Sequence, residues 1–301
     1  MKWKDFSIVI VTKNRYSQLL ESVISICDNL LKPLTIIIVD GSINVNTTII
    51  RRIMNICRKR GINLQHIKDY SNLAQCRNIG FSNVHTKYFS FIDDDQYTPK
   101  KWTSHVKNIF RDNSKIDVLI GPLLSKHLHN YWNIIWLDIN RDQLQIEGRV
   151  NFTPGANTCF KTEFLQKNNI SFNNRFTYAA EDWGISYVLQ KKHAYMYQTP
   201  RLTVLHDCRV TIGSFFKQWF KYGQGIQEYH TFYFLEKQHR FVSKITSTIR
   251  LLTARYPIYP NQKKMRLIPG YILLNISFLL GYIYSLLRQT AKNYMRSIKT
   301  K

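Results

Sequence analysis

The chain has 301 residues, a length that fits one large domain or one domain with an appendage. Its hydrophobic content of 44% and aromatic content of 14% are those of a packed protein and exclude a disordered one. The 43 Lys and Arg residues against 19 Asp and Glu residues give a net charge of +24. This charge favours anionic partners, namely nucleic acid, an acidic membrane leaflet or phosphorylated substrates, and does not choose among them.

Strand and helix patterns alternate along the first two thirds of the chain. Short β-branched or aromatic runs predict strands, and apolar residues at helical spacing predict helices. This alternation predicts an α/β fold in which helices cover both faces of a mainly parallel sheet. The expected strands are 6–11, 34–39, 63–67, 88–92, 118–121 and 203–206, and the expected helices are 18–31, 49–60, 73–82, 100–111 and 185–190.

The cysteines and the N-terminal run indicate a cytosolic protein. The apolar run 6–11 is too short for a secretory signal, and Lys13 and Arg15 soon follow it. The cysteines are odd in number and contain no C-x-x-C pair, which favours reduced thiols over a disulfide framework or a zinc site. They are Cys27, Cys57, Cys76, Cys159 and Cys208.

The strand 88–92 ends in three consecutive carboxylates, Asp93, Asp94 and Asp95. Such carboxylates repel one another unless a cation or hydrogen-bond donors lie among them. In open α/β sheets ligands bind beyond the carboxyl ends of the strands, and hard cations prefer oxygen ligands. The triplet therefore favours a Mg²⁺ or Mn²⁺ site that carries a diphosphate. The other interpretation is a solvated acidic turn before Pro99.

No glycine-rich phosphate-binding loop accompanies this triplet. Neither a G-x-G-x-x-G nor a Walker A sequence occurs in the chain. The phosphates of a bound nucleotide would therefore be held by a metal and by side chains rather than by backbone amides. The segment 125–149, rich in His, Asn and Trp, has no clear pattern, and we interpret it as a flexible insertion over the site.

Two further polar segments follow. Pro154 and Gly155 predict a turn that leads into a strand. Glu181 and Asp182 lie at the start of the expected helix 185–190, where helix capping alone would explain two carboxylates.

Six segments of the chain resemble motifs of the family 2 glycosyltransferases and occur in the same order as in that family. The resemblance covers roughly residues 6–225. Cys76 stands where this family usually has Ala. The resemblance implies the GT-A nucleotide-sugar fold, which has a mixed, mainly parallel, Rossmann-like sheet. The six segments are Ile8 to Arg15, Ile37 to Ser42, Arg77-Asn78-Ile79-Gly80, Phe91-Ile92-Asp93-Asp94-Asp95, Gly155-Ala156-Asn157 and Glu181-Asp182.

The resemblance implies a role for each matched residue. Asp40 would accept a hydrogen bond from a uracil-like base, and Asp93 would hold the ribose. Asp182 would be the general base, with Glu181 as its neighbour. The other nucleotide-binding residues would be Thr12, Asn14, Arg15, Arg77 and Asp94; the metal ligands would be Asp95, Asp93 and His206; and the residues at the donor or acceptor sugar would be Gly155, Ala156, Asn157 and Trp183. A hydrogen-bonded histidine at a strand end is the plainer interpretation of His206.

The implied activity is that of a metal-dependent, inverting glycosyltransferase. It would move a sugar from a nucleotide-diphospho-sugar, such as a UDP-sugar, to a glycan, lipid-linked or other hydroxyl acceptor in cell-surface polysaccharide synthesis. A cation would neutralise the diphosphate, and a carboxylate opposite would take the proton of the attacking hydroxyl.

Two other functions are compatible with parts of the sequence. A sugar nucleotidyltransferase on a similar sheet would need a glycine-rich loop, and residues 12–16 contain no glycine. A nucleic-acid-binding protein is suggested by the charge alone, since no helix-turn-helix, zinc finger or RNP-type motif is present. We therefore expect no nucleic-acid partner.

The composition changes after residue 213, and we predict a catalytic domain at 1–212 and a helical, membrane-associating region at 213–301. Aromatic residues at 215–222, interleaved with Lys217 and Lys221, predict a helix that covers the acceptor side, lies on a membrane or packs in the core.

The run 267–287 is uncharged and close to the ~20 residues that span a bilayer. Asn275 and Ser277 within it, and basic residues at both ends, favour a helix in the membrane interface or a re-entrant hairpin over a span. A buried packing helix is the alternative. We expect peripheral attachment to an anionic membrane at the cytoplasmic face. The flanking basic residues are Lys263, Lys264 and Arg266 on one side and Arg288, Lys292, Arg296, Lys299 and Lys301 on the other.

Overall fold

The computed structural model describes residues 1–127, 130–208, 211–234 and 266–299. The chain separates into two compact units. The first consists of Met1–Lys126, Asn140–Arg175 and Glu181–Asp207, and the second of His127–Ile139, Phe176–Ala180 and Cys208–Lys301. The second unit thus contains two short segments from within the range 1–212, and a domain boundary at residue 212 stays a prediction.

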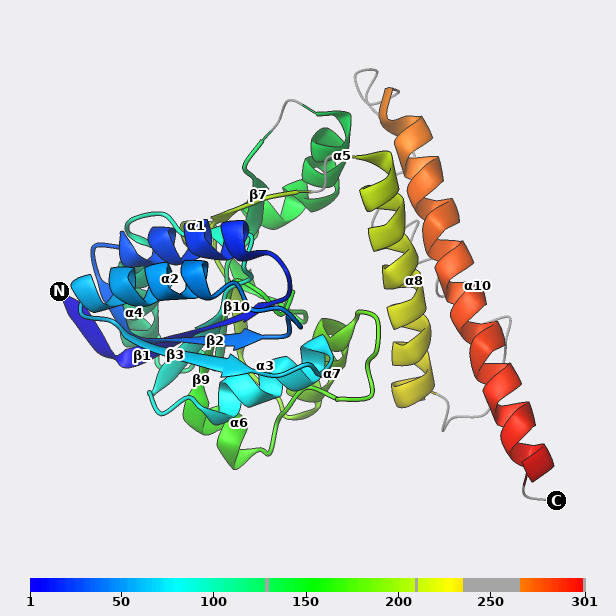
Figure 1. The fold of residues 1–301 in the computed structure, drawn as a ribbon, viewed down its shortest axis with the longest axis horizontal. Coiled ribbons are helices and arrows are strands. Elements are labelled where there is room, and N and C mark those ends of the chain that lie inside the picture. Colours follow the sequence, from blue (N-terminus) through cyan, green and yellow to red (C-terminus); the bar gives the residue numbers. More distant parts are fainter. Residues whose placement is uncertain (128–129, 209–210, 235–265, 300–301) are drawn as a thin grey trace. The chain divides into compact units, whose positions relative to one another are not determined.

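An eight-stranded sheet forms the centre of the first unit (Figure 1). Its strands are β1 (Lys2–Thr12), β2 (Lys32–Asp40), β3 (Asn63–Lys68), β4 (Tyr88–Phe91), β6 (Val118–Ile120), β8 (Gly148–Arg149), β9 (Thr158–Lys161) and β10 (Met196–Gln198). Their order is β3-β2-β1-β4-β9-β6-β10-β8. β3, β2, β1 and β4 run parallel, and β9 is antiparallel to both of its neighbours. The predicted mixed, mainly parallel sheet is confirmed.

Helices cover both faces of this sheet (Figure 1). Successive residues of a strand point to opposite faces, so Ile8 and Ile10 pack in one hydrophobic cluster and Val9 packs in the other. The first cluster includes α1 (Tyr16–Cys27), α2 (Thr47–Lys59) and α4 (Trp102–Asp112), and the second includes α3 (Leu73–Ser82), α6 (Thr162–Lys167) and α7 (Glu181–Lys191). The carboxyl ends of β1, β2 and β4 therefore meet at one edge, beyond the two cores.

The first helix and the second strand differ from their predicted bounds. The sequence predicts a helix at 18–31 and a strand at 34–39, but α1 ends at Cys27, and β2 begins at Lys32 and contains Pro33. Pro33 pairs with Trp3 of β1, whereas β3 pairs with β2 only from Thr35 onward. Pro33 thus lies where β2 has a partner strand on one side only, a position at which a residue without an N–H is tolerated.

A second, three-stranded sheet brings His206 to the loop that follows β4. Its strands are β5 (Gln96–Tyr97), β7 (Leu123–Ser125) and β11 (Val204–His206), and the 3₁₀ helix η2 (Pro200–Leu202) precedes β11. His206 pairs in register with Gln96, the residue after Asp95. The predicted last strand thus belongs to this small sheet rather than to the main one.

The segment 125–149 is not a loop, contrary to our interpretation. It contains the helix α5 (Tyr131–Asn140), the 3₁₀ helix η1 (Arg141–Gln145) and β8. Ile135 of α5 is fully buried against Phe215 and Leu274 in the second unit. This apolar contact explains why a segment without strand or turn signals is ordered as a helix.

Two long helices make up most of the described residues of the second unit: α8 (Ile212–Phe234) and α10 (Ile268–Lys299). Both were predicted as helical segments. Because α10 is one continuous helix, a re-entrant hairpin within 267–287 is wrong. Lys263, Lys264 and Lys301, which we expected at the membrane, lie outside the described residues.

Candidate active site

The three carboxylates after β4 lie in three different environments. The side chain of Asp93 is 34% exposed, that of Asp95 is 7% exposed and that of Asp94 is fully buried. Thr12, at the end of the neighbouring strand β1, donates a hydrogen bond from Oγ1 to Asp94 Oδ2 at 2.7 Å. Arg15 pairs with Asp94 at 2.5 Å and also with Asp95. The loop after β1 therefore supplies the donors that hold the second and third carboxylates.

Burial dominates the ionisation of Asp94. It raises the pKa of this carboxyl to about 7, although the nearby guanidinium of Arg15 acts in the opposite direction. For Arg15, burial opposes the charge, but the three aspartates outweigh it and raise the pKa of the guanidinium. Arg15 thus stays charged beside a carboxyl that burial favours as the neutral acid.

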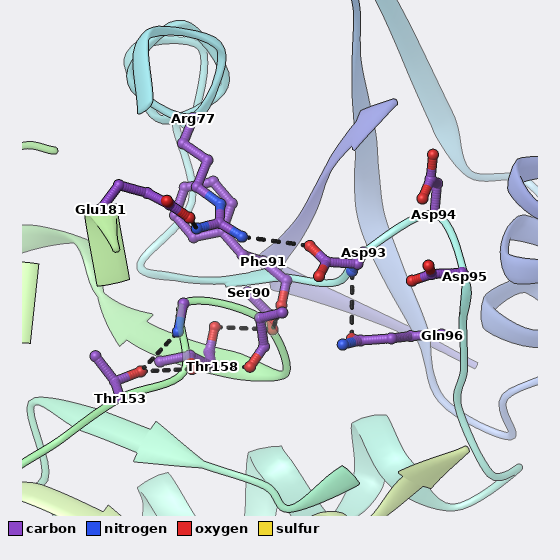
Figure 2. A network of polar contacts seen from close by, with 12 residues as sticks. Arg77, Ser90, Phe91, Asp93, Asp94, Asp95, Gln96, Thr153, Thr158 and Glu181 are labelled. Carbon is purple, nitrogen blue, oxygen red and sulfur yellow. Dashed lines mark hydrogen bonds and ion pairs between the residues drawn. The ribbon is translucent and has the colours of Figure 1, made fainter. Parts of the chain in front are cut away.

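Arg77 connects the aspartate loop to the start of α7. It donates from Nη1 to Glu181 Oε1 at 2.6 Å and from Nη2 to Asp93 Oδ1 at 3.4 Å. Figure 2 shows its guanidinium between these two carboxylates, and it also lies over the rings of Phe91 and Phe172. Burial opposes the charge on Arg77, but Glu181, Asp93 and Asp182 together raise its pKa. The buried, charged guanidinium of Arg77 therefore connects the Asp93-Asp94-Asp95 motif to the Glu181-Asp182 motif.

Glu181 and Asp182 occupy the first turn of α7, as predicted. The backbone N–H of Trp183 donates to Asp182 Oδ1 at 2.9 Å. Gly155 approaches both partners of this site: a Cβ added to it would lie 2.6 Å from Arg77 Nη1 and 3.2 Å from Asp182 Cβ. Its φ of +72° is also a conformation that favours glycine. Gly155, Arg77 and Asp182 are thus packed against one another.

Asp40 is fully buried at the end of β2. Its carboxylate accepts hydrogen bonds from Tyr16 Oη at 2.8 Å and from the backbone N–H of Ser42 at 2.9 Å, and its Oδ2 lies 3.2 Å from His66 Nε2. Burial acts to raise the pKa of Asp40, but these contacts outweigh it, and the pKa is lowered. A base could bond directly to Asp40 only if one of these partners moved.

Tyr16, Ser42 and His66 are site residues that our prediction did not include. Ser42 also accepts the backbone N–H of Asn14 at 2.7 Å, and Asn14 has a positive φ of 58°. Ser42 lies within a matched motif, and His66 of β3 pairs with Ile38 of β2 in the sheet register. Nothing in the local sequence of either Tyr16 or His66 distinguishes it from a residue outside the site.

The turn at Gly155-Ala156-Asn157 has a structural role that we did not expect. Asn157 is fully buried, donates to the carbonyls of Pro122 and Leu202, and accepts from Trp102 Nε1 at 3.1 Å. We predicted Asn157 at the donor or acceptor sugar, and donation from its amide to a sugar would replace the bonds to these two carbonyls. Ala156 is also buried, whereas Trp183 is half-buried and its ring lies 5.1 Å from that of Phe152. Of the predicted sugar-contacting residues, Trp183 is the more accessible.

The residues near Asp95 fit a metal ion only if the substrate supplies further ligands. His206 Nε2 lies 3.4 Å from Asp95 Oδ1. Within the part of the chain that the structure describes, no three His, Cys, Asp or Glu side chains converge on one metal position. Mg²⁺ commonly uses one or two carboxylates together with substrate phosphates, and Mn²⁺ likewise prefers oxygen ligands. The chemistry of the donor pair therefore suits a cation shared with a diphosphate.

One sequence family matches the part of the chain that contains most of this site. The model of the family described as "Glycosyl transferase family 2" matches residues 7–168. No curated protein matches the chain.

Several solved structures share the fold at low sequence identity. The mannosyltransferase PcManGT from Pyrobaculum calidifontis, in complex with GDP-Man and Mn²⁺, gives a TM-score of 0.61 at 12% identity over 94% of this chain and 88% of that chain. S. aureus TarS 1-349 in complex with UDP-GlcNAc gives 0.53 at 15% identity over 98% and 92%. A longer S. aureus TarS structure gives 0.55 at 13% identity over 93% of this chain and 54% of that chain.

Proposed function

The chain belongs to glycosyl transferase family 2, and from this premise we propose that it transfers a sugar from a nucleotide-diphospho-sugar to a hydroxyl acceptor. The observation that carries the proposal is the contact of one buried arginine, Arg77, with both Asp93 and Glu181. Arg77 thereby connects two acidic groups on different elements. One is Asp93, at the end of β4 and partly exposed to solvent, and the other is the pair Glu181 and Asp182 at the start of α7. Family membership also argues against the nucleic-acid-binding and nucleotidyltransferase interpretations.

We propose a UDP-sugar as the donor. Asp93 has the most exposed carboxylate of the triplet and would accept from the ribose hydroxyls. The base would bind beside the Asp40 cluster and exchange a hydrogen bond with Tyr16 or His66, which now contact that carboxylate. A UDP-GlcNAc complex and a GDP-Man complex among the solved structures of this fold support a nucleotide-sugar donor and leave the base as our proposal.

Asp95 and His206 are the residues that we expect to hold Mn²⁺ or Mg²⁺. When bound, such a cation supplies charge neutralisation for the leaving diphosphate. Arg15 contacts the same carboxylate, and its guanidinium would supply a second positive charge for the diphosphate. Mn²⁺ in the PcManGT complex supports the use of a divalent cation on this fold.

Asp182 is the proposed general base. It lies in the first turn of α7, where backbone N–H groups favour a negative charge. It would take the proton of the acceptor hydroxyl as that oxygen attacks the anomeric carbon in line with the leaving diphosphate. One displacement inverts the configuration at that carbon. Glu181, held by Arg77, would position the turn rather than receive the proton.

The proposal is tested by transfer assays on UDP-, GDP- and dTDP-sugars with Mn²⁺ or with chelator. We expect turnover with one donor that is lost with chelator. Asp182→Asn should lose transfer and keep nucleotide binding, and Asp95→Ala should lose both at low Mn²⁺. Asp142→Asn, whose side chain is 89% exposed, is the matched control. A folded protein that binds no nucleotide in the presence of metal would refute the proposal.

The proposals for the acceptor and for the location rest on the second unit. We propose a glycan or lipid-linked acceptor of cell-surface polysaccharide synthesis, and peripheral attachment at the cytoplasmic face of the cell membrane. One helix among the described residues, at Ile268–Ala291, is long and apolar enough to cross a membrane by length and composition, and 39% of its apolar window is buried. This helix supports a location at the membrane, and it is compatible both with a span and with a helix that lies on the surface.

A further inference from the structure

α10 has two apolar faces, and among the residues that the structure describes only one of them is packed against another helix. Leu274, Phe278, Gly281 and Tyr282 face α8, and the three side chains among them are buried. The opposite face carries six aliphatic side chains that are 43–65% exposed. We call these the outer strip: Ile272, Ile276, Leu279, Leu280, Ile283 and Leu287.

The covered face fixes α10 to α8 by close backbone contact. A Cβ added to Gly281 would lie 2.0 Å from the carbonyl oxygen of Phe220, and one added to Gly223 would lie 1.9 Å from that of Phe278. Ser277 donates to the carbonyl of Phe216 at 2.6 Å. Small residues that allow such an approach leave no room for rotation of one helix against the other.

Polar side chains extend this contact toward the end of α10. Ser285 donates to Gln227 at 2.8 Å, and Gln227 in turn donates to Gln289 at 2.7 Å. Tyr282 Oη lies 3.2 Å from His230 Nδ1. These polar groups contact one another across the interface, so the face of α10 toward α8 is packed along this stretch. The outer strip takes no part in this packing.

The outer strip has the spacing of a single helix face. Its members follow one another at intervals of three or four residues, apart from the adjacent pair Leu279 and Leu280. A helix on the surface of a soluble protein carries polar residues on the side away from its core. The strip instead presents only aliphatic groups over about 24 Å of helix, at 1.5 Å per residue. Apolar patches of this extent mark interaction surfaces.

The charges that follow the strip in the sequence favour an anionic lipid surface. Arg288 follows Leu287 directly and is exposed. In the sequence Lys292, Arg296, Lys299 and Lys301 come after it, with no acidic residue between them. Aliphatic groups beside a run of positive charge are the two elements by which a helix binds in the headgroup region of an acidic leaflet.

The helix pair argues against a span. α8 lies along α10 from the Phe216–Ser277 contact to the Thr231–Gln289 hydrogen bond. On this stretch α8 exposes Lys217 and Lys221 to solvent. If α10 crossed the bilayer with α8 attached, these two ammonium groups would enter the hydrocarbon, which is costly.

We propose that α10 lies along the surface of an anionic bilayer, with the outer strip in the acyl region of one leaflet and α8 behind it. This inference deepens the membrane part of the proposed function and rests on it. It assigns the contact to one face of one helix and excludes a transmembrane arrangement.

The first test is flotation of the full chain with vesicles of mixed phosphatidylglycerol and phosphatidylcholine. We expect the protein to float with these vesicles, and less with phosphatidylcholine alone. The triple variant Ile276→Glu, Leu280→Glu, Ile283→Glu should lose about tenfold or more in partitioning. The matched control, Leu30→Glu with Ile43→Glu, changes side chains of the first unit that are 58% and 74% exposed and should float like the unmodified protein.

Two readouts separate this inference from the proposed transferase function. UDP binding with Mn²⁺, measured in solution, should be the same in the triple variant and the unmodified protein. A triple variant that still floats would overturn the inference. So would an unmodified protein that does not float but forms a dimer that the triple variant lacks, because the strip would then contact a second copy.

Orientation is tested with epitope tags at Met1 and after Lys301, in sealed membrane vesicles whose cytoplasmic face points outward. A helix that lies on the surface leaves both tags open to added protease. Protection of the C-terminal tag alone would show a span and overturn the inference.

Discussion

Arg15 contacts only two of the three carboxylates in the loop after β4. It contacts Asp94 and Asp95, while Asp93 is bound by Arg77 on the other side. The proposed cation would bind the carboxylate of Asp95, whose Oδ2 accepts from Arg15 in this structure. We therefore propose that Arg15 stabilises the metal-free site and competes with the cation for this carboxylate.

Substitution of Arg15 measures this competition. We expect Arg15→Gln to bind Mn²⁺ about tenfold more tightly in the absence of nucleotide, which corresponds to about 1.4 kcal/mol, because the competing guanidinium is removed. Free Mn²⁺, measured by electron paramagnetic resonance during titration, gives the affinity. Arg60→Gln, which removes the exposed pair of Arg60 with Asp28, is the control and should leave the affinity unchanged. An equal or weaker affinity in Arg15→Gln would mean that Arg15 does not compete with the metal.

The lowered pKa of Asp40 links stability to pH. A carboxyl with a lowered folded pKa stabilises the fold above its ordinary value of about 4, and this stabilisation is lost as the pH falls through the folded value. Asp40→Asn should therefore cost about 1–3 kcal/mol of unfolding free energy at pH 7, and the difference should shrink below about pH 4. Urea unfolding at a series of pH values measures it. Asp142→Asn should show no such difference, and a constant deficit in Asp40→Asn would refute the linkage.

At the residue scale, the resemblance carried by six short motifs named several of the side chains that contact one another in the structure, such as Arg15, Arg77 and Glu181, and omitted Tyr16 and His66. It could not predict how they share their bonds. The burial of Asp94, the commitment of Asn157 to three backbone or indole partners, and the hydrogen bond of Tyr16 to Asp40 all depend on contacts between distant segments. Such contacts leave no mark on the local sequence.

At the element scale, two glycines in the second unit offer a direct test of helix packing. Gly281→Ala would place a methyl group 2.0 Å from the backbone oxygen of Phe220, so the helices must separate. Overpacking of this kind costs about 1–3 kcal/mol. Gly213→Ala in α8 meets no atom within 4 Å and should be neutral or slightly stabilising because alanine favours helix. Thermal unfolding followed by circular dichroism compares the two variants, and equal midpoints would refute the close packing of α8 and α10.

The long, periodic elements were predictable because each carries enough residues to show its period. The short ones were not. β5, β8 and β10 contain two or three residues each, which is too few for a strand pattern, and η1 and α5 come from a segment with no apolar strand or turn signal. The predicted end of the first helix was wrong. A proline in the part of a strand that has only one partner strand resembles, in sequence, a proline that follows a helix.

The whole molecule carries a net charge of +24, and this charge acts on its two proposed partners to different degrees. At a vesicle surface the basic residues are exposed and meet the lipid through water, where salt screens charges over about 10 Å at 0.1 M and about 3 Å at 1 M. In the first unit, the charged groups of the site are mostly buried, as Arg77 and Asp95 are, and buried charges are screened much less.

We therefore expect salt to separate the two activities. Raising the salt concentration from about 0.1 M to about 1 M should sharply weaken binding to phosphatidylglycerol vesicles and change the affinity for UDP with Mn²⁺ much less. Flotation and titration calorimetry on the same preparation give both values. The residual binding at high salt should come from the outer strip, so the triple variant should bind no vesicles there. Equal losses of vesicle and nucleotide binding would instead indicate that the nucleotide is held by exposed charge, and that the buried site around Arg77 is not where it binds.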